Sequence, residues 1–178
     1  MKFATSLKWP DLSGRLFYIL KTFAIMFAVV YAVNWYQTRN LPDRIGDLMI
    51  TDTGSTPVST RRLIGEKPVA LLYIFAPWCG VCKLTLPTLE AVRKAHGHVE
   101  VIPLALGFES KAEVDAMVGA AGYTGTYYYG TDQIGEILQI QAFPTMMFLS
   151  RDGSVRAAAL GYSTRLGISA RLIWVGLF

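Results

Sequence analysis

The sequence contains little charge. Asp, Glu, Lys and Arg make up 17% of its 178 residues and hydrophobic residues 52%, whereas about a quarter of a typical soluble domain is charged. This composition excludes a disordered, collagen-like or coiled-coil protein. Residues 1–36 carry four basic side chains and one acidic one, a net charge of +3, and residues 37–178 carry 13 basic and 12 acidic side chains, a net charge of +1. The near-neutral second part lacks the basic face of a nucleic-acid-binding domain.

Cysteine and histidine are also scarce, with two of each. Two cysteines are too few for the disulfide framework of a small secreted domain. With His96 and His98 they form the spacing C-x2-C-x13-H-x-H, whereas a zinc finger separates its histidines by about three to five residues. We therefore expect no metal site. The alternative from another functional class is a copper- or zinc-binding metal-tolerance protein that uses the cysteine pair with His96 and His98.

The longest apolar run covers residues 16–36 and contains one charge, Lys21, near its start. As a helix with a rise of about 1.5 Å per residue, it spans the thickness of a bilayer core. Tyr18, Trp35 and Tyr36 mark its two ends, as aromatic belts do. The run therefore predicts a transmembrane anchor.

The positive charges precede this run. The positive-inside rule then predicts a cytoplasmic N-terminus over residues 1–15 and a domain over residues 37–178 on the opposite side of the membrane. A signal peptide cleaved after Val30-Tyr31-Ala32 is the alternative, but the apolar run continues past that site.

Beyond residue 40, strand patterns alternate with helix patterns, which indicates an α/β fold around a mixed sheet flanked by helices. We expect a weak hairpin within residues 46–60, strands over Val69–Ala76, Val99–Leu106, Thr126–Tyr129, Met146–Leu149 and Val155–Leu160, and helices over Gly80–His96, Lys111–Ala121 and Gln133–Ile140, with a last helix capped by Ser163 and running toward Phe178.

The two cysteines belong to one motif, WCGVC at residues 78–82, placed between a buried strand and a helix. At the helix N-terminus, free N–H groups and the helix dipole favour the thiolate of Cys79. Cys82 follows one turn later, within reach of a disulfide with Cys79. Because a disulfide that closes so short a loop stabilises a fold very little, the motif favours thiol–disulfide exchange.

With these features the sequence resembles the thioredoxin superfamily, and more narrowly its membrane-anchored TlpA/ResA/DsbE class. Within that class it is most similar to the suppressor for copper-sensitivity D proteins, which are protein disulfide oxidoreductases. The residues that carry the resemblance are Leu71–Ala76, Trp78–Lys83, Pro87, Phe143-Pro144-Thr145 and Asp152-Gly153.

The resemblance implies a thioredoxin fold with a helix and strand inserted near residues 109–132, and a cis-proline, Pro144, that faces the cysteines. Trp78, Phe143 and Thr145 would then help to hold a disulfide-containing protein substrate. The class implies a periplasmic domain on a single inner-membrane anchor, and reduction of substrate disulfides by the Cys79–Cys82 pair. A membrane electron donor would re-reduce this pair, and no cofactor is expected. The same chemistry run in reverse, by a disulfide-introducing oxidase, is the alternative.

The sequence departs from the family pattern at two positions. Thioredoxin has a buried Asp in the strand before its motif, where this chain has Tyr73. Some reducing members have a Glu three residues beyond the second cysteine, where this chain has Thr85. Both acids are associated with proton transfer at the resolving thiol, so the sequence identifies no general base for Cys82.

Overall fold

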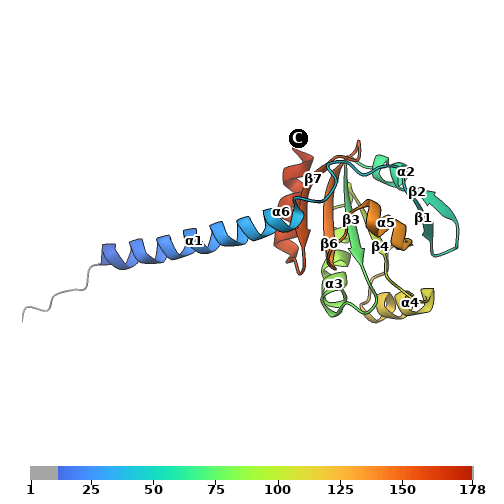
Figure 1. Cartoon of the computed structure of the whole chain (residues 1–178), viewed down its shortest axis with the longest axis horizontal. Coiled ribbons are helices and arrows are strands. Elements are labelled where there is room, and N and C mark those ends of the chain that lie inside the picture. The colour runs from blue at the N-terminus through green and yellow to red at the C-terminus, as the bar shows by residue number, and fades with distance from the viewer. Residues whose placement is uncertain (1–11, 178) are drawn as a thin grey trace, which may run out of the picture. The chain divides into compact units, whose positions relative to one another are not determined.

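The computed structural model describes residues 12–177, and the chain divides into one unit that ends at Gln37 and another that begins at Thr38. Helix α1 (Leu12–Thr38) accounts for the described part of the first unit (Figure 1). Its segment Arg15–Tyr36 has a mean hydropathy of 2.1, and none of it is buried. By length and composition, α1 could therefore cross a membrane. Residues 1–11 of the predicted cytoplasmic N-terminus lie outside the described residues.

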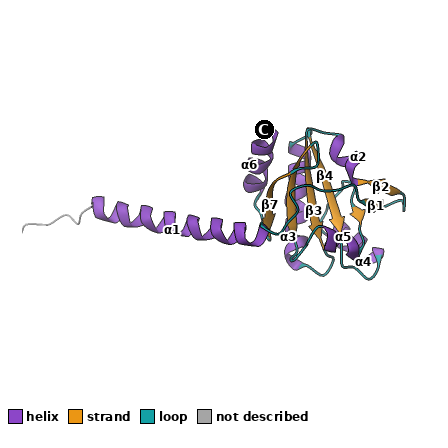
Figure 2. Ribbon diagram, turned by 45° about the horizontal axis from the view of Figure 1, so that its top comes forward, coloured by secondary structure: helices purple, strands orange, loops and turns teal. Residues whose placement is uncertain are grey.

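The second unit combines strands and helices, as the alternating patterns predict (Figure 2). Its strands are β1 (Met49–Asp52), β2 (Pro57–Ser59), β3 (Val69–Phe75), β4 (Val99–Ala105), β5 (Tyr128–Tyr129), β6 (Thr145–Ser150) and β7 (Val155–Leu160). Its helices are α2 (Thr60–Gly65), α3 (Gly80–Ala95), α4 (Lys111–Ala120), α5 (Asp132–Ile137) and α6 (Arg165–Gly176). The inserted helix and strand expected from the family resemblance are α4 and β5.

The strands form one mixed sheet in the order β2-β1-β5-β4-β3-β6-β7. Strand β3 pairs in parallel with β4 and antiparallel with β6, so it lies in the middle of the sheet. Every residue of β3 is buried, and residues with odd and even numbers belong to two different core clusters. The odd-numbered residues pack with α3, α4 and α6, and the even-numbered ones with α2 and α5. The sheet is thus covered on both faces, and the predicted α/β architecture is confirmed.

Two local expectations need correction. The pattern of residues 46–60 predicts the hairpin of β1 and β2 but not α2, which begins directly after it because the Ser59 side chain caps its first turn. The predicted cap of the last helix, Ser163, is wrong. The Thr164 hydroxyl accepts a hydrogen bond from the Gly167 N–H at 3.2 Å and caps α6, whereas Ser163 is buried.

Candidate active site

The cysteine motif lies at the carboxyl end of the central strand. After β3 the chain turns through Pro77 and Trp78, and the Cys79 N–H donates to the Ala76 carbonyl at 3.1 Å to close that turn. Cys79 is the N-cap of α3, which starts at Gly80. A buried strand followed by a tight turn therefore fixes Cys79 at a helix N-terminus, the position expected from the sequence.

Cys79 and Cys82 form a disulfide, with 5.2 Å between their Cα atoms. The Cys82 N–H donates to the Cys79 sulfur at 3.1 Å. Cys82 is fully buried, while 7% of Cys79 is exposed. In the reduced protein, the same backbone donor and the helix N-terminus would stabilise a thiolate on Cys79. The geometry thus distinguishes the two cysteines: Cys79 is the N-cap residue of α3 and retains some exposure, whereas Cys82 is fully enclosed.

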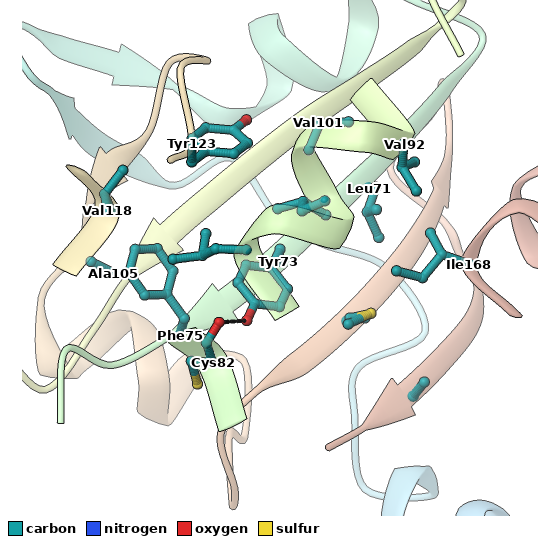
Figure 3. Close-up of a cluster of buried hydrophobic side chains, with 14 of the residues drawn as sticks. Leu71, Tyr73, Phe75, Cys82, Val92, Val101, Ala105, Val118, Tyr123 and Ile168 are labelled. Atoms are coloured by element: carbon teal, nitrogen blue, oxygen red, sulfur yellow. Dashed lines mark hydrogen bonds between the residues drawn. The ribbon is translucent and has the colours of Figure 1, made fainter. Parts of the chain in front are cut away.

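Two neutral residues near the start of α3 replace acids of the family pattern: Tyr73 in β3 and Thr85 in α3 itself. The Tyr73 hydroxyl donates to the Cys82 carbonyl at 3.2 Å (Figure 3). The Thr85 hydroxyl donates to the Val81 carbonyl at 2.8 Å. Burial raises the pKa of Tyr73, and a hydrogen bond with Thr85 opposes this effect. Neither residue is a carboxylate, so neither supplies the base that acids at these positions are associated with.

Trp78 forms the rim of the site. Its side chain is 69% exposed, yet two contacts hold it. The indole Nε1–H donates to the Gly107 carbonyl at 2.8 Å, and the ring contacts the Phe143 ring edge-on at 5.4 Å between centroids. Trp78 thus connects the loop after β4 with the segment before β6. No sequence pattern points to its contact with Gly107, because 28 residues separate the two in the chain.

The Phe143–Pro144 peptide bond is cis. The register of β3 and β6 pairs Ile74 with Thr145, so Pro144 lies beside the end of β3 from which the cysteine turn departs. The Thr145 hydroxyl donates to the Ala142 carbonyl at 2.7 Å and closes this segment on itself. The fold therefore brings the segment 143–145 to the same end of the sheet as the cysteine pair.

An open groove of about 440 Å³ adjoins this rim. Gly107 and Phe143, the two partners of Trp78, line one part of it, and α5 lines another. Its polar lining residues are Asp132, Glu136, Gln139 and Gln141. No residue pattern in the sequence indicates this groove.

The two histidines lie at the opposite end of α3. His96 is the C-cap of this 16-residue helix, and its Nε2 is 2.9 Å from the Ser169 hydroxyl. A helix of this length rises about 24 Å, so the histidines and the cysteines cannot bind one metal ion. Among residues 12–177, no group of three or more His, Cys, Asp or Glu side chains is placed to hold a metal ion.

Comparison with known proteins agrees with this geometry. The family model described as a thioredoxin-like domain matches residues 58–172, which is more than half of the chain. A thioredoxin-like protein of Haemophilus influenzae is 26% identical over 162 residues, which cover 89% of this chain and 93% of that protein.

Solved structures show the same fold. A thiol:disulfide interchange protein of the thioredoxin family from Chlorobium tepidum superposes with a TM-score of 0.65 at 17% identity, over 76% of this chain and 97% of that one. A secreted Mycobacterium tuberculosis disulfide oxidoreductase, described as homologous to Escherichia coli DsbE, gives 0.61 at 19% identity, over 74% and 96%. The chain therefore belongs to the thioredoxin-like family and carries a Cys-x-x-Cys redox pair at the start of α3.

Proposed function

We propose that this protein is a thiol–disulfide oxidoreductase that is anchored in a bacterial inner membrane by α1 and reduces disulfides of periplasmic proteins. The observation that carries the proposal is the hydrogen bond of 3.1 Å from the Cys82 N–H to the sulfur of Cys79, the N-cap of α3. A sulfur so placed is a nucleophile with its resolving partner one helical turn away.

The reaction has two steps. The Cys79 thiolate attacks one sulfur of the substrate disulfide, a mixed disulfide forms, and the other substrate sulfur leaves and takes up a proton. Cys82 then attacks the Cys79 sulfur, loses its proton, and releases the second substrate thiol. The substrate gains two electrons and two protons, and the pair ends as the Cys79–Cys82 disulfide.

We assign substrate binding to the segment 143–145, which lies at the same end of the sheet as the cysteines. Phe143, Pro144 and Thr145 precede and begin β6, and an extended substrate chain could lie against their backbone as an additional strand. Trp78 supplies an exposed aromatic surface next to Cys79 that two contacts hold in place. We assign these four residues to substrate positioning.

The direction of electron flow is decided by the reduction potential of the pair. Equilibration with glutathione or dithiothreitol buffers should give a value near or below about −200 mV, the range of thioredoxin and glutaredoxins. A value near about −120 mV, with the pair fully oxidised when trapped in cells, would instead identify a disulfide-introducing oxidase. A reductase also needs a membrane electron donor, because Cys79 and Cys82 end each cycle oxidised.

The anchor is tested separately. With α1 in the membrane, the protein stays in the pellet after alkaline carbonate washing, and a reporter fused after Phe178 behaves as periplasmic. A soluble protein that lacks residues 1–32 would show that Val30-Tyr31-Ala32 is a cleavage site and that the mature domain is not anchored.

A further inference from the structure

The backbone N–H and the carbonyl of Cys82, the resolving cysteine of the proposed reaction, each form a hydrogen bond within the site. Its N–H donates to the Cys79 sulfur at 3.1 Å, and its carbonyl accepts from the Tyr73 hydroxyl at 3.2 Å. Tyr73 is fully buried in β3, and its ring stacks on that of Phe75 with 5.7 Å between ring centroids and 19° between ring planes. The central strand is thus connected directly to the first turn of α3 (Figure 3).

We infer that Tyr73 is a positioning residue for the second step of the reaction, and this inference rests on the proposed function. Its hydroxyl fixes the Cα of Cys82, and with it both the sulfur that must attack Cys79 and the N–H that contacts the Cys79 sulfur. Because the tether runs to the backbone of Cys82, it does not depend on whether the two sulfurs are bonded.

The Tyr73 hydroxyl is a hydrogen-bond donor at physiological pH. Burial raises the pKa of Tyr73, so the hydroxyl keeps its proton and remains a donor. The described residues bury one carboxylate, Glu90, which lies two turns further along α3 and is occupied by Arg93 and Thr124. Tyr73 therefore acts by geometry alone, and the proton of Cys82 leaves with the departing thiol or to water.

The test separates the two steps with an aromatic disulfide whose released thiolate is coloured, such as 5,5′-dithiobis(2-nitrobenzoate). Attack by Cys79 releases one coloured thiolate at a rate proportional to reagent concentration. Attack by Cys82 on the mixed disulfide releases a second coloured thiolate at a rate that does not depend on reagent concentration. In Tyr73→Phe the ring remains and the hydrogen bond is lost, so the second phase should slow about five- to tenfold while the first changes less than about twofold.

Tyr123→Phe is the matched control. Tyr123 is also buried in the same core cluster, but its hydroxyl has no hydrogen-bond partner among the described residues. Its removal should leave both phases unchanged. A Tyr73→Phe protein that folds and retains an unaltered second phase would overturn the inference.

Two further results keep the test decisive. If the unaltered reduced protein shows no first phase, the proposed function fails, whatever Tyr73 does. If Tyr73→Phe does not fold, the hydroxyl proton of Tyr73 is examined by NMR in the unaltered protein. Slow exchange with solvent and a through-space contact to the Cys82 backbone are expected, and rapid exchange would contradict the tether.

Discussion

The two ends of α3 are stabilised in opposite ways. Near its start, the Cys82 carbonyl accepts a hydrogen bond from the neutral hydroxyl of Tyr73. Two turns further on, the buried carboxylate of Glu90 accepts hydrogen bonds from Arg93 at 2.8 Å and from the Thr124 hydroxyl at 2.7 Å, and pairs with Lys94 at 3.1 Å. The first end holds the redox pair, and the second fastens the helix to the loop before β5.

The residues that hold the redox pair and the charged network that stabilises the fold therefore lie in different parts of one helix. A charge beside the cysteines would shift the balance between thiol and thiolate, whereas a charge about 12 Å away along the helix has a much weaker effect on them. The helix can therefore carry a strong polar network without changing the reactivity of Cys79. Mutations at the two ends should affect different measurements.

The largest effect is expected at the cysteines themselves. Cys79→Ser should abolish disulfide reduction, because no other thiolate can start the reaction. Cys82→Ser should still attack, and it should accumulate mixed disulfides that non-reducing electrophoresis detects. In the reduced protein, alkylation below neutral pH should modify Cys79 far faster than Cys82. Equal labelling of the two thiols at all pH values would contradict our assignment of their roles.

At the other end, Glu90→Gln should lower the free energy of unfolding by about 1–3 kcal/mol, because Arg93 and Thr124 lose a charged partner in a buried position. Urea denaturation measures the loss. Both phases of the aromatic disulfide reaction should remain as in the unaltered protein. Glu109→Gln, at an exposed position outside this network, is the control and should change stability by less than about 0.5 kcal/mol. A slowed reaction in Glu90→Gln would remove the separation we describe.

The same carboxylate predicts a pH dependence of stability. Hydrogen bonds from Arg93, opposed by burial, lower the pKa of Glu90 far below its ordinary value. Its stabilising contribution is therefore fully present above about pH 4.3, the value of an unfolded Glu, and is lost as the pH falls below it. The difference in unfolding free energy between the unaltered protein and Glu90→Gln should shrink between about pH 5 and pH 2. A constant difference over that range would contradict the lowered pKa.

The smallest effect concerns the rim of the redox end. Trp78→Phe keeps an aromatic ring next to Phe143 but loses the hydrogen bond to the Gly107 carbonyl. We expect kcat/KM for a protein disulfide to fall about fivefold, mainly through KM, with stability nearly unchanged. Trp174→Phe, on the exposed side of α6, is the matched control. If both substitutions have the same effect, Trp78 has no special part in substrate binding.

The sequence predicted the central elements of the fold because their patterns are strong. Val69–Phe75 is continuously apolar, and the cysteine motif between it and a helix identified both the fold and the redox pair. The short helix α2 was not predicted, and the predicted strand over Thr126–Tyr129 could not be placed in the sheet from its pattern alone. Strand β5 has only two residues, and its pairing with β1 and β4 depends on contacts far apart in the chain.

The features of the site that the sequence did not reveal are side-chain contacts across the fold. Tyr73 could be recognised as a departure from the family pattern, but its bond to the Cys82 carbonyl depends on how β3 packs under α3. Ser163 and Thr164 are both good helix caps by residue type. Only the start of α6 decides that Thr164 has that role.

The connection between α1 and the second unit is short. Asp43 and Ile45 hydrogen-bond to the hairpin of β6 and β7 at 2.8 and 2.9 Å, and Arg44 pairs with Asp152 there at 2.6 Å. Only residues 39–42 separate this attachment from the end of α1, and four residues extend at most about 14 Å.

If α1 crosses a membrane, a linker of four residues would limit how far the redox pair can move from the bilayer surface. A partner that is also held at the membrane would then meet the pair at a higher effective concentration than a partner in free solution. The length of this linker would therefore influence which partners react with the pair. It would favour partners that are themselves held near the membrane over those that diffuse freely, with no contribution from the residues around Cys79.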